Sequence, residues 1–257
     1  MQITQRKTIF SALAASILVL SATAYLLADR YLIEHVEVAN IPPAAALVST
    51  PVAVQAAAAA TPAPTAAPQK TAAVPTAVTS DAWNYRSDDV TISIKKVVTG
   101  SGASTVTYFT ADVVLADATQ LSNAFAKNKF GRNIIETTSQ IAENNGAIFA
   151  INGDYYGFRT DGIIIRNGVI YRDQPARIGL AFYTDGSMKI YDETTTSAQA
   201  LLKSGVWNTL SFGPALVQNG VVATSFKNVN IDNNLGNHTI EGANPRTGVG
   251  IIDKNHF

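Results

Sequence analysis

The residues best suited to chemistry lie in one short stretch, Ala150–Arg159, with the sequence AINGDYYGFR. The apolar run Ala147–Ile151 has the composition of a buried strand and ends abruptly in Asn152, Gly153 and Asp154. A strand end is a rigid platform, and glycine lets the backbone turn sharply or approach a ligand closely. Asp154 supplies a carboxylate, and Asn152 supplies an amide that both donates and accepts hydrogen bonds. The pattern therefore predicts a small-molecule site, although Asn-Gly-Asp also occurs in ordinary turns.

Aromatic and basic residues extend this expected site. Tyr155 and Tyr156 offer flat faces that suit a sugar ring, or they close a hydrophobic core. We assign Arg166, at the end of an apolar run, to substrate binding as well. Gly213 joins it, because the Gly-Pro pair in the string SFGP forms either a tight wall of a cleft or the start of a hairpin.

A second cluster, NPRTG, stands immediately before the apolar run Val249–Ile252. Arg246 in this string enters an expected strand between Pro245 and Gly248. Its guanidinium fork matches a phosphate or a carboxylate in shape and charge. A surface arginine at the entry to a strand would have the same sequence pattern, so both interpretations stay open.

The strings AINGDYYGFRTDGIIIRNGVIYRD, SFGPALVQNG and NPRTGVGIID occur in this order, and together they resemble the phosphodiester glycosidase domain family. The resemblance covers roughly Tyr85 to Asp253. The family includes the enzyme that removes N-acetylglucosamine from a phosphodiester on lysosomal enzymes, and bacterial surface proteins linked to exopolysaccharide biosynthesis. The resemblance implies hydrolysis of the bond between the anomeric carbon of a sugar and a phosphodiester, without a cofactor. Such a reaction passes through an oxocarbenium-like state that carboxylates stabilise.

The resemblance also implies roles for the expected site residues. Asp154 would act on the sugar, Arg246 would hold the phosphate, and Asn152 would orient the substrate. The residues expected to shape the substrate pocket are Gly153, Tyr155, Tyr156, Arg166 and Gly213.

The end of the chain departs from the family pattern. Family members continue after the Asn-Pro-Arg-Thr strand into a Leu-Asp-Gly-Gly-Gly-Ser-Ser signature, which this sequence lacks. The residues predict a strand over Gly248–Asp253, a turn over Lys254–His256 and the start of a return strand at Phe257. We therefore expect a fragment or a truncated product with doubtful activity as written. A non-catalytic glycan-binding or polysaccharide-assembly protein of the cell envelope is the alternative function.

The elements expected to position these residues are mainly hairpins. The dipeptides Asn167-Gly168, Asp185-Gly186 and Asn219-Gly220 each lie between two apolar runs. Such dipeptides suit type I′ turns, because both central residues of that turn need a positive φ. Alternation predicts strands over Val90–Ile94 and Thr105–Leu115. Helical spacing predicts helices over Ala118–Ala126 and Asn133–Asn144. The fold class is therefore α+β, with one antiparallel β-rich domain and a few helices.

Composition excludes several classes of function. Basic and acidic residues number 19 each, so no basic field attracts nucleic acid, and no nucleic-acid partner is expected. The chain has no cysteine, which rules out disulfides, thiolate metal sites and cysteine nucleophiles. A weak calcium-loop pattern at Asn230, Asp232, Asn234 and Glu241 has Leu235 where the sharp turn needs glycine, which favours a plain polar loop.

The first eighty residues predict an anchor and a linker. Thr8–Ala28 is uncharged and long enough to span a bilayer, and Arg6 and Lys7 before it should stay inside the cell. A signal peptide cleaved near Ala24 is the alternative. We expect a cytoplasmic stub and anchor over residues 1–40, a disordered linker rich in alanine, proline and threonine over 41–80, and an extracytoplasmic domain over 81–257. The expected partners are the membrane and a glycosyl-phosphodiester or polysaccharide substrate.

Overall fold

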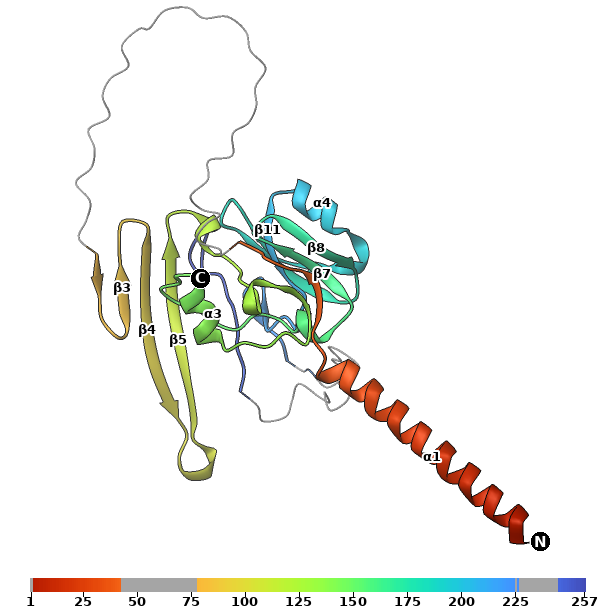
Figure 1. The fold of residues 1–257 in the computed structure, drawn as a ribbon. Helices are drawn as coiled ribbons and strands as arrows, with labels where there is room; N and C mark the ends of the chain where they lie inside the picture. Colours follow the sequence, from red (N-terminus) through yellow and green to blue (C-terminus); the bar gives the residue numbers. More distant parts are fainter. Residues whose placement is uncertain (1, 43–77, 225, 227–244) are drawn as a thin grey trace, which may run out of the picture.

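The computed structural model describes residues 2–42, 78–224, 226 and 245–257. Helix α1 (Gln2–Tyr31) projects away from a β-rich unit (Figure 1), and the span Leu13–Tyr31 has no residue buried against the protein. Its length and composition suit either a membrane-spanning helix or a signal sequence. Every strand pair of the described residues is antiparallel and the helices are few, which confirms the predicted α+β class.

A strand directly after α1 belongs to the folded unit. Strand β1 (His35–Val38) pairs antiparallel with β6 (Phe130–Arg132), and the Ile41 amide donates to the Asn128 carbonyl at 3.0 Å. The folded unit therefore includes residues on the N-terminal side of residue 81, where the sequence placed the start of the domain.

A four-stranded sheet forms one side of the unit (Figure 1), in the order β2-β3-β4-β5. Its strands are β2 (Thr79–Ser80), β3 (Asn84–Arg86), β4 (Val90–Thr99) and β5 (Val106–Leu115), and the 3-10 turn η1 (Gly102–Ser104) joins the last two. The long β4–β5 ladder sets Val90 opposite Leu115, with buried Ile92 and Leu115 on the same face. The two strands expected over Val90–Ile94 and Thr105–Leu115 are thus confirmed.

The other side is built from the predicted hairpins. Strands β7 (Gly162–Arg166) and β8 (Val169–Gln174) form one hairpin, while β9 (Ile178–Tyr183), β10 (Met188–Asp192) and β11 (Val206–Leu210) form a sheet in the order β10-β9-β11. The 3-10 turn η5 (Glu193–Thr195) and helix α4 (Ala198–Lys203) connect β10 to β11. Strands β12 (Val217–Gln218) and β13 (Val221–Val222) form the third hairpin.

The turns differ in detail from the expectation. Both central residues have positive φ at Asn167-Gly168 (51° and 75°) and at Asn219-Gly220 (52° and 77°), as a type I′ turn requires. At Asp185-Gly186 only the glycine does, with φ 82°. The amide of Gly186 donates to the Tyr183 carbonyl, which makes this loop one residue longer than a type I′ hairpin loop.

Strand β7 lies between two hydrophobic clusters because its side chains alternate across the strand. Ile163 and Ile165 enter a cluster with Ala181, Leu201 and Val206. Ile164 points the other way, into an aromatic cluster formed by Phe125, Phe130, Tyr156 and Tyr171. Burial on both faces fixes β7 in the centre of the unit, and with it the position of Arg166 at its end.

The predicted helices are shorter than their periodicity suggested. The stretch 118–126 contains only the 3-10 turn η2 (Ala118–Gln120) and the start of η3 (Ala126–Asn128). An Asp117–Gln120 capping box begins η2, and Leu121 ends it because its ψ of 89° lies outside the helical region. In the second stretch only α3 (Thr138–Asn144) is helical. Asn133 has a φ of 59°, outside the right-handed helical region, which delays the start of this helix.

Two expected strands are absent from the described structure. Residues 147–151 form no strand, and Ile148 and Ile151 in this run are exposed rather than buried. Residues 248–253 form no strand either, although the turn over 254–256 is present and Phe257 exchanges two backbone hydrogen bonds of 2.9 Å with Val113 of β5. An apolar run forms a strand only where a neighbouring edge takes up its backbone groups, and neither run meets one here.

Candidate functional site

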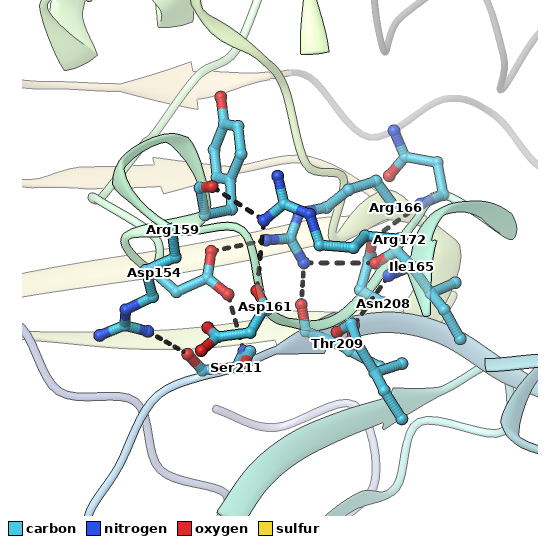
Figure 2. Close-up of polar contacts among 12 residues, drawn as sticks. Asp154, Arg159, Asp161, Ile165, Arg166, Arg172, Asn208, Thr209 and Ser211 are labelled. Carbon is cyan, nitrogen blue, oxygen red and sulfur yellow. Dashed lines mark hydrogen bonds and ion pairs between the residues drawn. The ribbon is translucent and has the colours of Figure 1, made fainter. Parts of the chain in front are cut away.

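The centre of the candidate site is an ion pair between Asp154 and Arg166. Oδ1 of Asp154 accepts a hydrogen bond from Nη2 of Arg166 at 2.6 Å (Figure 2). The side chain of Asp154 is only 1% exposed and that of Arg166 only 3%. The second carboxylate oxygen accepts from the backbone amide of Ser211 at 2.7 Å. The pair therefore joins the loop before η4 (Tyr156–Phe158), the end of β7 and the residue after β11.

Nη1 of Arg166 is also engaged. Its Nη1 donates to the Thr209 carbonyl and, at 3.3 Å, to the Ile165 carbonyl, and the guanidinium lies over the ring of Tyr156 with 5.7 Å to the centroid. Thr209 completes the connection, because its hydroxyl accepts from the Ile165 amide and donates to the Ile163 carbonyl. The buried charge pair is thus held by backbone groups of two neighbouring strands.

Three further arginines lie beside this pair, two of which, Arg159 and Arg172, are labelled in Figure 2. Arg159 donates to the Ser211 carbonyl at 2.8 Å, and Arg177 donates to the Ser211 hydroxyl at 2.8 Å. Arg177 also pairs with Asp161 at 2.7 Å, while Arg172 donates to the Asp161 carbonyl at 3.2 Å. We call Arg159, Arg166, Arg172 and Arg177 the arginine cluster. The carboxylates of Asp154, Glu37 and Asp161 pair with three of these four guanidinium groups, so most of the positive charge of the cluster is balanced within the protein.

Burial changes the acid–base behaviour of two groups beside the pair. Desolvation lowers the pKa of Arg172, and the nearby carboxylates of Glu37, Asp161 and Asp154 oppose that change. Desolvation raises the pKa of Tyr156, with the positive charge of Arg166 opposing it. Both directions follow from the cost of a charge away from water.

An aromatic surface lies beside the arginine cluster. Tyr155 is half exposed and meets the ring of Phe212 edge to face, with 5.3 Å between centroids. The guanidinium of Arg159 lies over both rings, at 5.3 Å and 5.6 Å. A flat aromatic face next to cationic groups is suited to a sugar that carries a phosphate.

A small cavity of about 220 Å³ borders the other side of Arg166. Phe125, Asn167 and Tyr171 line it together with the side chains of Asn123 and Asn128. This volume is below the range usual for drug-sized ligands, and the surface that lines the cavity is mainly apolar.

The structure brings together only some of the residues assigned from the sequence. Asp154 and Arg166 are in direct contact, and Tyr156 packs against Arg166 within the aromatic cluster. Gly213 follows Ser211–Phe212 and is joined to Pro214 by a cis peptide bond. Among the described residues Asn152 is exposed and makes no hydrogen bond, and the neighbouring Gly153 is exposed too.

Arg246 is exposed in the segment 245–257. The hydrogen bonds to the two oxygens of Asp154 come from Arg166 and Ser211 rather than from Arg246. The calcium-loop pattern at residues 230–241 lies outside the described residues. Within the described ranges, no group of three or more His, Asp or Glu side chains is arranged to hold a metal ion.

Sequence reasoning missed much of the arginine cluster and Glu193. The fully buried Glu193 carboxylate accepts from the amides of Ile163, Ala176 and Arg177 at 2.9–3.0 Å. One signal was present, since a charged residue inside an apolar run, as Arg172 is in VIYRD, must find partners when the run is buried. The partners themselves come from distant segments and leave no local pattern.

The fold and the site together define an α+β domain with a buried ion pair inside an arginine cluster. Residues 145–257 match the phosphodiester glycosidase family, which confirms the predicted resemblance for this part of the chain. The matched segment contains Asp154, Arg166, Arg177 and Arg246.

One curated relative is the SPbeta prophage-derived uncharacterized protein YomE of Bacillus subtilis (strain 168). It is 30% identical over 105 residues, which cover 37% of this chain and 16% of the prophage protein. The chain thus spans only a small part of the length of that relative. No solved structure matches the chain significantly.

Proposed function

We propose that this protein is a membrane-anchored hydrolase of glycosyl phosphodiesters that works outside the cytoplasmic membrane, in cell-envelope or exopolysaccharide metabolism. The observation that carries the proposal is the family match over residues 145–257, a segment that includes the buried Asp154–Arg166 pair and most of the residues expected to bind substrate. The uncharged stretch of α1 and the basic residues Arg6 and Lys7 before it support the anchored, outward-facing arrangement.

The proposed reaction is hydrolysis at the anomeric carbon. Water attacks that carbon, the bond from the carbon to the phosphodiester oxygen breaks, and the electron pair leaves with the phosphate as a phosphomonoester. One proton of the water passes to solvent or to a carboxylate, and the sugar keeps the new hydroxyl. Because the phosphate is a good leaving group, anion binding by arginine matters more than a strong general acid.

Each residue has a role in this proposal. Arg246 binds the phosphate, Asn152 orients the sugar, and the half-exposed Tyr155 supplies the face against which the sugar ring stacks. Asp154 acts through charge on the sugar side of the site, where it pairs with Arg166.

The test is release of free sugar from the methyl phosphodiesters of glucose 1-phosphate and N-acetylglucosamine 1-phosphate by the full chain. We expect Arg246→Ala to lower kcat/KM about 100-fold, the usual effect of removing one donor to a developing anion. Lys203→Ala, which removes an exposed charge at the end of α4, is the matched control and should not change it. Equal rates for Arg246→Ala and the parent chain would remove Arg246 from the site.

A non-catalytic glycan-binding protein is the second candidate, and one observation favours it. The Asp154 side chain is 1% exposed and both of its oxygens have protein partners, so it does not face solvent. Under this alternative the same phosphodiesters bind to the full chain in calorimetry but release no sugar, whereas turnover in the same preparation supports the hydrolase.

A further inference from the structure

Large aliphatic side chains surround the end of α1 where the helix meets the folded unit. Leu32 and Ile33 follow the helix directly and are 78% and 41% exposed, and Ile135 is 63% exposed. We call these three residues the apolar rim. Leu32 and Ile135 are separated by more than one hundred positions in the sequence, so only the fold brings them to the same end of the helix.

A set of hydrogen bonds fixes the rim to the helix. The side-chain amide of Asn133 donates to the carbonyls of Asp29, at 3.2 Å, and Ile33, at 2.9 Å. Asn133 is itself buried, and Ile135 is only two residues further along, within about 7 Å at 3.8 Å per residue.

Two more contacts brace the same junction. The His35 ring nitrogen Nε2 lies 2.9 Å from the Asp29 carbonyl, and Lys127 pairs with Glu34. The β1–β6 ladder begins immediately after them, with His35 opposite Arg132. The connection between α1 and the folded unit is therefore a braced joint rather than a flexible one.

The position of the joint along the helix sets where the rim would lie in a membrane. Thr8–Ala28 is uncharged and spans about 30 Å at 1.5 Å per residue, so a bilayer crossed by α1 ends near Asp29. Tyr25 and Tyr31 are of the type that favours the headgroup region on either side of that boundary. Leu32 and Ile33 lie within one helical turn beyond it.

The charges around the joint are balanced. Basic side chains here belong to Arg30, Lys127, Lys129 and Arg132, and acidic ones to Asp29, Glu34, Glu37 and Glu136. A balanced surface with an apolar centre fits an uncharged, zwitterionic lipid surface rather than a strongly anionic partner.

We propose that the apolar rim rests in the interfacial region of the bilayer that α1 crosses, and that Asn133 holds the folded unit on the membrane in one orientation. The occupant of the rim is lipid, because Leu32 and Ile33 stand only Asp29, Arg30 and Tyr31 beyond the exposed apolar stretch of α1. The inference rests on the anchoring part of the proposed function and not on the hydrolysis.

The absence of cysteine allows a direct test in the full chain. Ile135→Cys and Leu32→Cys each carry one polarity-sensitive fluorophore, and the labelled protein is reconstituted into phosphatidylcholine vesicles that contain a lipid with a quencher near its headgroup. Gln199→Cys, exposed on α4 at the end of the unit away from α1 (Figure 1), is the matched control. The Ile135 and Leu32 labels should emit at shorter wavelength than the control and lose about half of their emission to the quencher.

Quenching of the label at Ile135 is the measurement that tests the proposal. Leu32 stays near the bilayer in any case because it follows the helix, whereas Ile135 is close only if the joint holds. Adding Asn133→Ala should therefore reduce quenching at Ile135 and leave quenching at Leu32 unchanged. An unquenched Ile135 label in the parent background, which needs no destabilising change, would overturn the proposal.

Two other results would also overturn it. Emission at Ile135 that depends on protein density and not on the quencher lipid would assign the rim to a second copy of the chain. Loss of the protein from alkaline-washed membranes would show that α1 is not a retained anchor. Sugar release is measured separately, so its failure leaves the outcome at the rim unaffected.

Discussion

Asp154 and Arg166 form an ion pair of 2.6 Å in which neither side chain reaches solvent. Nη1 of Arg166 and the second oxygen of Asp154 meet backbone groups of β7, β11 and the residue after β11. A buried pair of this kind adds little to stability relative to apolar residues, but the loss of one partner leaves an uncompensated charge. The pair is therefore a constraint on which substitutions the site tolerates.

Removing one partner should destabilise the fold strongly. We expect Arg166→Met to lower the free energy of unfolding by about 3–5 kcal/mol, because Asp154 would then remain charged in a dry environment. Urea denaturation measures the change. The double variant Asp154→Leu/Arg166→Met should lose less than Arg166→Met alone, and a loss equal to the sum of the two single changes would contradict the coupling. Asp89→Asn, at an exposed carboxylate, should change stability by less than about 0.5 kcal/mol.

Glu193 should behave as a structural acceptor. Its two oxygens take up three backbone amides, including that of Ile163 in the centre of the core. In Glu193→Gln one of these oxygens becomes a donor that faces amide donors, so we expect a loss of about 2–3 kcal/mol in urea denaturation. The exposed Glu143→Gln serves as the control. Equal stability of the two variants would contradict the role of Glu193.

Tyr156 should make stability fall in alkali. Burial raises its pKa in the folded state above the ordinary value near 10, so the stabilisation is fully present below pH 10. It is lost as pH rises from about 10 through the folded pKa, because the unfolded chain releases the proton first. Tyr156→Phe should therefore show a shallower decline of unfolding free energy above pH 10, while the exposed Tyr108→Phe should match the parent. Identical slopes for both variants would exclude this role.

Gly131 should control whether β1 stays in place. A Cβ at this position would lie 1.9 Å from the His35 carbonyl oxygen, a backbone atom that cannot move without breaking the β1–β6 ladder. Gly131→Ala should therefore raise amide hydrogen exchange over His35–Val38 by at least about tenfold, equivalent to 1.4 kcal/mol of local stability. Gly248→Ala, where a Cβ meets nothing within 4 Å, is the control. Unchanged exchange would show that the ladder tolerates the side chain.

Local signals predicted the fold well where one dipeptide determined the structure. The hairpins at Asn167-Gly168 and Asn219-Gly220 formed as expected because the turn conformation depends on those residues alone. The helix expected over 118–126 failed because tertiary hydrogen bonds from Asn208 to the Leu121 carbonyl and from the Asn123 amide to Asn167 overrode its periodicity. The strand expected over 147–151 failed because a strand needs a partner edge, which a single segment cannot reveal.

The candidate site was predictable only in part, for the same reason. Asp154 was visible as a carboxylate at the end of an apolar run, but its partners are twelve and fifty-seven residues away. Arg159 and Arg177 belong to separate segments and both donate to Ser211, and nothing in their local sequence predicts these contacts. Most contacts of the site join residues that are far apart in the sequence, so no local sequence pattern predicts them.

The pairing of β1 also changes how the segment 43–77 is to be regarded. Both of its flanks belong to the folded unit, through the Ile41–Asn128 hydrogen bond on one side and the β2–β3 pair on the other. Its length therefore does not set the reach of the domain from α1. Changes in the length of this segment should therefore leave the placement of the folded unit on α1 unchanged, because Asn133 and the β1–β6 pair set that placement.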